Sequence, residues 1–181
     1  MLSAESESSR QSAQAADAPA SPIHVLVVLG EGGHTKQCLR LIDLLGTTNY
    51  RYSYIVVAED PVTEAKIRVP GAVHRVARPG STKSHLLVRL ARLPRCTLHS
   101  GIAVLRTRPD AVVSTGPGVA VPVCAVAKLL GARIIYVESF SRVRRLSLTG
   151  RLLRQLADLF FIQWEELQPL IPRAVYAGRL Y

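Results

Sequence analysis

The chain has 181 residues, of which 48% are hydrophobic and 20% charged, and its formal net charge is +10 at pH 7. A chain of this length can bury a sizeable core, and we expect one folded domain with a tail. The basic excess predicts attraction to polyanions: nucleic acid, anionic lipid or diphosphate ligands. Aromatic residues make up only 6% and are not interleaved with basic ones, which argues against base stacking on nucleic acid.

The N-terminal segment 1–22 is polar and rich in Ser, Ala and Gln. It lacks the apolar core of a secretory signal, and we expect a disordered polar tail. The longest apolar stretch, 119–127, is too short to span a bilayer. The three cysteines are widely spaced and form no CxxC pattern. They therefore indicate neither a zinc site nor a disulfide framework, and they fit a reduced cytosolic setting.

Predicted strands and helices alternate along the chain. Strands are expected at 23–29, 52–58, 72–77, 111–115, 132–139 and 159–163. Helices are expected at 34–46, 61–67 and 119–130, with basic helical segments at 81–108, broken near Pro94, and at 142–157. Apolar strands alternating with helices predict an α/β fold, a Rossmann-like parallel sheet with helices on both faces.

The first strand runs into a glycine-rich loop, in the sequence IHVLVVLGEGGHT. A strand, a glycine turn and a helix point free N–H groups and a helix dipole at an anion, and glycines let the ligand approach closely. We therefore expect Gly30, Gly32, Gly33 and Thr35 to bind a phosphate or pyrophosphate. Alone the motif is weak, because such a turn can be purely structural. Glu31 would also repel an anion unless its side chain points away.

Two nucleotide-binding classes are disfavoured by what surrounds this loop. A P-loop NTPase needs a Lys-Ser/Thr pair after the loop, and none follows. A dinucleotide site prefers an acidic residue at the end of the second strand, whereas Glu59 and Asp60 lie just beyond it in the loop. A dinucleotide-binding module stays a minor alternative.

Two further features follow strand ends: the loop STGPG at 114–118, and Glu138-Ser139. Ligands of open parallel sheets bind beyond the carboxyl ends of the strands, so one shared cleft is predicted. The second loop is either a second phosphate nest or a tight structural turn. If the shared cleft binds a phosphate or pyrophosphate, the additional residues expected to bind it are Ser114, Thr115, Gly116, Gly118 and Ser139.

Two side chains of this predicted cleft are candidate acid–base groups. His34 begins the helix after the first loop, where it either serves a phosphate or a proton transfer, or is bonded locally. Glu138 ends an apolar strand, where a carboxylate has either a role in the site or a structural partner among Arg142, Arg144 and Arg145.

Both basic segments mix Leu and Val with Arg at amphipathic spacing. Such helices can lie on an anionic membrane surface. The alternative is ordinary helices that cover a sheet and leave their arginines in solvent. The residues expected to contact the membrane are Arg89, Arg92, Arg95, Arg144 and Arg145.

Three stretches together resemble the Alg14 family: GEGGHT, VSTGPGVAVPVCAVAKLLGARIIYVESFSRV, and the ending PRAVYAGRLY. The resemblance covers about 23–181 and extends to the N-terminal domain of MurG. It implies the acceptor-side, N-terminal half of a split GT-B glycosyltransferase. An Alg13-like partner would bind the UDP-sugar, of UDP-GlcNAc type. This chain would bind a polyprenyl-diphosphate-linked sugar and recruit the partner to the membrane, with 175–181 docking on it.

The resemblance further implies an inverting enzyme that is active only with its partner in lipid-linked oligosaccharide or polysaccharide synthesis. His34 and Glu138 are then the catalytic candidates. No metal is expected, since no Asp-x-Asp motif occurs, and no cofactor is expected on this chain. The protein would be peripheral, on the cytoplasmic face of the membrane. Two departures stand out: family members from eukaryotes begin with a membrane helix where this chain has a polar tail, and Glu31 replaces a small residue.

Two other classes of function stay open from the sequence. The first is a non-catalytic nucleotide- or nucleic-acid-binding module, which only the basic charge supports, so no nucleic-acid partner is expected. The second is a membrane scaffold whose partner supplies every catalytic group.

Overall fold

The computed structural model describes residues 21–78 and 86–180, without the side chains of 86–90. Its strands form one parallel sheet in the order β3-β2-β1-β4-β5-β6-β7. The strands are β1 (Ile23–Val28), β2 (Tyr50–Val57), β3 (Gly71–Val76), β4 (Ala111–Ser114), β5 (Arg133–Val137), β6 (Leu159–Ile162) and β7 (Val175–Tyr176). The predicted Rossmann-like α/β fold is confirmed. Nearly all of the predicted tail lies outside the described residues.

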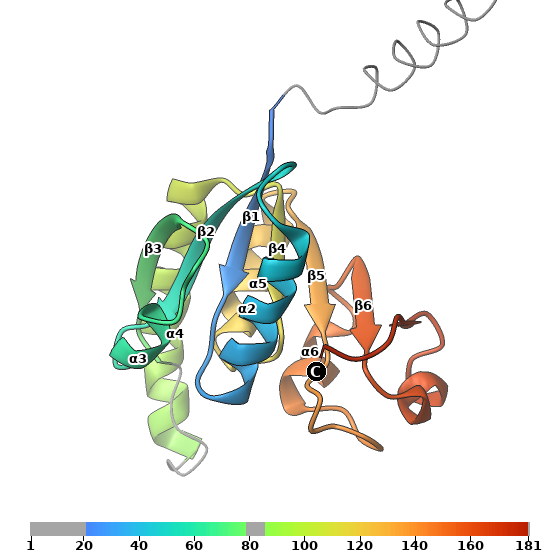
Figure 1. The fold of residues 1–181 in the computed structure, drawn as a ribbon. Coiled ribbons are helices and arrows are strands. Elements are labelled where there is room, and N and C mark those ends of the chain that lie inside the picture. Colours follow the sequence, from blue (N-terminus) through green and yellow to red (C-terminus); the bar gives the residue numbers. More distant parts are fainter. Residues whose placement is uncertain (1–20, 79–85, 181) are drawn as a thin grey trace, which may run out of the picture.

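Helices cover both faces of the sheet (Figure 1). They are α2 (Gly33–Leu45), α3 (Pro61–Glu64), α4 (Leu86–Thr107), α5 (Ala120–Leu129) and α6 (Leu148–Leu153), with the 3-10 helix η1 (Glu165–Leu170). In Figure 1, α2 lies in front of the central strands, whereas α4 and α5 lie behind them. One helix layer therefore starts directly from the glycine loop after β1.

The sheet separates two apolar cores. Val25 and Val27 of β1 face the core that contains Cys38 and Ile42 of α2, while the intervening Leu26 faces the core beneath α4 and α5. Successive strand side chains point to opposite faces, so both faces of a fully covered strand must be apolar. This pattern explains the uninterrupted apolar run that precedes Gly30.

Two basic segments differ from their predicted form. α4 is one continuous helix through Pro94, and the turns after the proline are held against the sheet by the buried side chains of Cys96, Ala103 and Val104. The predicted helix 142–157 is wrong at its start, since α6 begins only at Leu148. The Ser147 side chain caps α6 by accepting a hydrogen bond from Gly150 N at 2.9 Å, which fixes the helix start there.

Candidate functional site

The two glycine loops are joined by a reciprocal pair of hydrogen bonds. His34 Nδ1 lies 2.7 Å from the carbonyl oxygen of Thr115, and Thr115 Oγ1 donates to the carbonyl oxygen of His34 at 2.7 Å. A carbonyl oxygen can only accept, so Nδ1 must donate its proton. In the neutral ring Nε2 then has the free lone pair. The loops therefore hold a half-buried histidine in the tautomer that can accept a proton at Nε2.

Glycine is required where these loops touch. A Cβ on Gly30 would lie 2.5 Å from Pro117 Cβ. Gly116 has a φ of +111°, and a Cβ there would lie 2.9 Å from the Tyr136 hydroxyl and 3.3 Å from His34 Cε1. Side chains at these two positions would push the loops apart. The predicted convergence of the two loops is thus realised in the fold.

The beginning of α2 is open. A Cβ on Gly32 or Gly33 would meet no described atom within 4 Å. Within the described chain, no side chain caps this helix end, and its first turn contains no acidic residue. Its first N–H groups are therefore available to an anion, and the helix dipole favours negative charge there.

Three hydroxyl side chains that were predicted to bind the ligand are instead buried within the protein. Thr35, Ser114 and Thr115 are fully buried. The Thr35 hydroxyl donates to the carbonyl of Gly30, and Thr63 Oγ1 lies 3.0 Å from that same oxygen. These side chains hold the loops in shape. Thr63, on α3, was not anticipated from the sequence, because its role depends on a fold contact 33 residues away.

Glu138 is fully buried, yet its carboxylate is well supplied with hydrogen bonds. Oε1 accepts from Ser139 N at 2.8 Å, and Oε2 accepts from Ser147 N and Ser147 Oγ, both at 3.2 Å. None of the three arginines considered as its partner forms an ion pair with it among the described residues. Gly150 is packed so closely that a Cβ there would overlap Oε2. The carboxylate thus fixes the turn that leads into α6.

Ser139 follows at the same strand end. It is almost fully buried, and its hydroxyl lies 3.1 Å from that of Ser141. Nearby, the Tyr136 hydroxyl lies 3.1 Å from Ser147 Oγ. Burial first, and then the charge of Glu138, raise the pKa of Tyr136 well above its ordinary value, so this hydroxyl stays protonated.

A glutamine pair that the sequence analysis missed connects the cleft to the C-terminal segment. Gln163 Nε2 donates to Gln37 Oε1 at 3.0 Å and to the carbonyl oxygen of Glu138 at 2.9 Å. Gln163 Oε1 accepts from Leu180 N at 2.9 Å, and Gln37 Oε1 also accepts from Phe140 N at 3.2 Å. The only signal in the sequence is a polar residue placed directly after the apolar strand β6.

The C-terminal segment lies along the sheet edge. Val175 and Tyr176 pair with β6 as the partly exposed strand β7. Further on, the Arg179 guanidinium lies 3.9 Å from the centroid of the Trp164 ring. Tyr181 lies outside the described residues.

Glu31 of the first glycine loop has an ion-pair partner. Its carboxylate forms an ion pair with Arg78, just after β3, and its side chain is 52% exposed. The Arg78 charge offsets the repulsion that Glu31 would otherwise exert on an anion at this loop.

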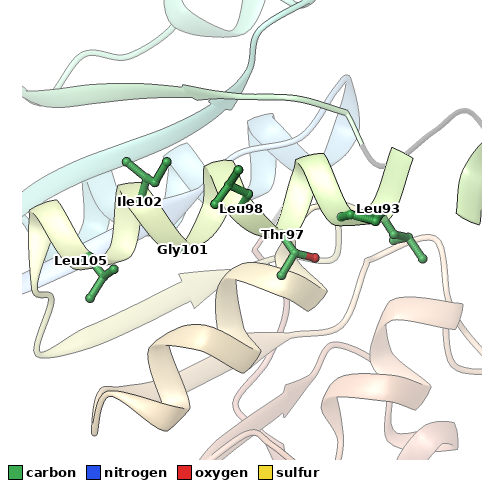
Figure 2. A pocket seen from close by; sticks show the side chains of 7 residues that line it. Leu93, Thr97, Leu98, Gly101, Ile102 and Leu105 are labelled. Atoms are coloured by element: carbon green, nitrogen blue, oxygen red, sulfur yellow. The ribbon is translucent and has the colours of Figure 1, made fainter. Parts of the chain in front are cut away.

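The arginines expected at a membrane lie on exposed surface. Arg92 and Arg95 are on α4, and Arg144 and Arg145 are in the loop before α6. The side chain of Arg89 lies outside the described residues. α4 also presents an apolar outer face with Leu93, Leu98, Ile102 and Leu105 (Figure 2). No helix in the described ranges is long and apolar enough to cross a membrane.

The described residues contain no group of three or more His, Cys, Asp or Glu side chains that could hold a metal ion. The titratable side chains found at these strand ends are the half-buried His34 and the buried Glu138.

Fold comparison defines the class of domain. MurG of Acinetobacter baumannii superposes with a TM-score of 0.58 at 20% identity, over 80% of this chain and 43% of that one. A UDP-N-acetylglucosamine 2-epimerase gives 0.66 at 13% identity, over 87% and 46%. The chain thus spans less than half the length of these proteins. It has the Rossmann-type architecture of one domain of a GT-B protein.

Sequence comparison identifies the family. Residues 25–180 match the model of the family described as "Oligosaccharide biosynthesis protein Alg14 like". The UDP-N-acetylglucosamine transferase subunit ALG14 of Mus musculus is 36% identical over 185 residues, covering 90% of this chain and 85% of that protein. The subunit of the same name from Candida albicans is 34% identical, covering 85% and 76%. The chain belongs to the Alg14 family.

Proposed function

We propose that this protein is the acceptor-side subunit of a UDP-GlcNAc-type glycosyltransferase in lipid-linked oligosaccharide or polysaccharide synthesis. Membership of the Alg14 family supports the proposal, since the relatives from mouse and Candida albicans are named as transferase subunits. The observation that matters most is the joining of the two glycine loops by His34 and Thr115, which gives Nε2 the free lone pair of the neutral His34 ring, beside an open helix end.

The proposed ligand of the cleft is a polyprenyl-diphosphate-linked sugar. Its diphosphate would lie against the open N-terminus of α2 at Gly32 and Gly33, and against the loop that contains Gly116 and Gly118. A diphosphate suits a helix N-terminus flanked by glycines, because N–H groups and the helix dipole both favour negative charge. The buried hydroxyls of the two loops keep this surface in shape, and the turn at Ser139 closes one side.

The proposed reaction is transfer with inversion. The acceptor hydroxyl oxygen attacks the anomeric carbon of the UDP-sugar as the bond to UDP breaks, and His34 Nε2 takes the hydroxyl proton. The diphosphate of the departing UDP would be stabilised by N–H groups of loops and helix ends on the partner's side of the complex rather than by a metal. Glu138 is the second candidate base. Its three hydrogen bonds within the protein suit the positioning of Ser139 and α6.

The proposal includes a partner and a membrane. An Alg13-like subunit would bind the UDP-sugar and dock against 175–181, while this chain itself holds no cofactor. The exposed arginines and the apolar face of α4 would rest on anionic lipid at the cytoplasmic face of the membrane, where the lipid-linked acceptor resides.

Replacement of His34 tests the catalytic assignment. In the complex with the partner, His34→Ala is expected to lower kcat by about 10²–10⁴-fold, the usual contribution of a general base. His74→Ala, the same change on the edge strand β3, is the matched control and should leave kcat nearly unchanged. Glu138→Gln, which retains much of the hydrogen bonding, distinguishes a positioning carboxylate from the base. Normal turnover of both His34→Ala and Glu138→Gln would favour a scaffold whose partner supplies all catalytic groups.

A further inference from the structure

A basic hollow lies beside the proposed acceptor cleft, at the carboxyl ends of β2 and β3. Its volume is about 290 Å³, and its polar lining consists of Glu59, Arg75, Arg78, Arg92, Arg95 and His99. We name it the arginine pocket. None of the residues proposed to bind the acceptor lines it.

One side of the arginine pocket is formed by side chains from a single face of α4. Arg92, Arg95 and His99 stand at positions i, i+3 and i+7 of α4, so they share one face of the helix. The two arginines form no ion pair with any described acidic residue. Like charges three residues apart on a helix disfavour each other unless an anion lies between them.

The opposite side of the pocket is held in place by ion pairs. Arg75 contacts the Glu64 carboxylate at 2.7 and 2.8 Å, and Arg78 pairs with Glu31. These contacts restrict both guanidinium groups while leaving further N–H donors unused, because a guanidinium has five. Glu59 is the one acidic side chain in the lining. With the paired Glu64 and Glu31 counted beside Glu59, four arginines against three carboxylates leave one net positive charge, and the unpaired arginines are Arg92 and Arg95 of α4.

We propose that the arginine pocket binds a phosphate-class anion, namely a monophosphate or diphosphate group that is either free in solution or exposed on a lipid headgroup. Guanidinium forks match phosphate oxygens in pairs, which a diffuse basic surface does not. The hollow is at the small end of ligand-pocket sizes and suits one or two phosphate groups rather than a whole nucleotide. This inference does not depend on the proposed transferase activity.

The soluble arm of the test is an NMR titration of the full chain with inorganic phosphate and with pyrophosphate at constant ionic strength. Saturable shifts are expected at Arg78, Arg92 and His99. The double variant Arg92→Gln/Arg95→Gln should weaken the affinity by about tenfold or more, the effect of losing charged hydrogen bonds. The matched control is Arg151→Gln/Arg154→Gln, which removes the same charge at the same spacing from exposed positions in and after α6. It should change the affinity less than twofold.

The lipid arm compares phosphatidylcholine vesicles that contain phosphatidic acid with vesicles that contain phosphatidylglycerol at equal surface charge. The arginine pocket predicts a preference for the exposed monophosphate of phosphatidic acid, which Arg92→Gln/Arg95→Gln loses and the control variant retains. Shifts with soluble anions identify a free ligand, and a preference seen only on vesicles identifies a headgroup.

Three results would overturn the arginine pocket. One is an equal loss of phosphate or pyrophosphate affinity in the two double variants, which would show that the anion is attracted by the overall positive charge and not by this pocket. Another is the absence of both saturable shifts and lipid preference. The last is a titration in which only the NMR signals of Gly32 and Gly33 shift. That result would support anion binding at the proposed acceptor site and contradict binding at the arginine pocket.

Discussion

At the scale of single residues, His24 links stability to pH. It is buried at the start of β1, with Nε2 2.8 Å from Ser53 Oγ. Burial, and then the nearby Arg51, lower its pKa below 6.5, against the opposing effect of Asp110. The unfolded chain therefore binds this proton more readily than the folded chain. The stabilisation is present above pH 6.5 and is lost as pH falls through the lowered folded pKa.

The measurement for His24 is urea unfolding at pH 7.5 and pH 5.5. The free energy of unfolding is expected to be lower at pH 5.5, and His24→Gln, which keeps a polar group near Ser53 but cannot titrate, should reduce that difference. The same pH dependence in His24→Gln as in the unaltered chain would contradict this account. Burial and then Arg106 lower the pKa of His74 too, so some dependence should remain in the variant.

Two glycines of the cleft should respond to alanine in opposite ways. Gly116→Ala places a Cβ against Tyr136 and His34 at a φ of +111°, and should cost about 1–3 kcal/mol of stability. Gly33→Ala adds a Cβ in open space at the first residue of α2, and should preserve stability or raise it by up to about 1 kcal/mol. If Gly33 contacts the acceptor diphosphate, that stable variant should still bind the acceptor more weakly. Chemical denaturation measures the stability of the two variants, and acceptor titration measures the affinity of Gly33→Ala. Equal losses of stability in the two variants would contradict the loop geometry.

At the scale of elements, Gln163 connects β6, α2 and the C-terminal segment. Gln163→Leu should cost about 1–3 kcal/mol, because buried partners lose their hydrogen bonds. Hydrogen exchange should quicken at Leu180, whose N–H loses its acceptor. Gln155→Leu, at an exposed position after α6, is the control. Unchanged exchange at Leu180 in Gln163→Leu would contradict the connection.

The elements and contacts that could be predicted from the sequence are those that depend on local sequence patterns. Six strands, the helix after the first loop and the meeting of both glycine loops follow from apolar runs, glycines and the rule for strand ends. The start of α6 was missed because Glu138, nine residues before Ser147, binds it. Likewise, Gln37 and Gln163 are 126 residues apart, and no local pattern predicts that contact. The pairing of Glu31 with Arg78 also depends on how strand ends come together.

At the scale of the whole molecule, the chain corresponds to about one half of its structural neighbours. It covers 43% of the MurG chain and 46% of the epimerase chain, whereas it covers 85% of mouse ALG14. A second domain that holds a UDP-sugar opposite His34 would complete the proposed active site.

The central proposal is therefore tested most directly by transfer of labelled GlcNAc from UDP-GlcNAc to a polyprenyl-diphosphate-linked sugar. Three samples are compared: this chain alone, an Alg13-like partner alone, and both together. The account predicts transfer only when both are present, and its loss when the complex contains His34→Ala. Robust transfer by this chain alone would contradict it.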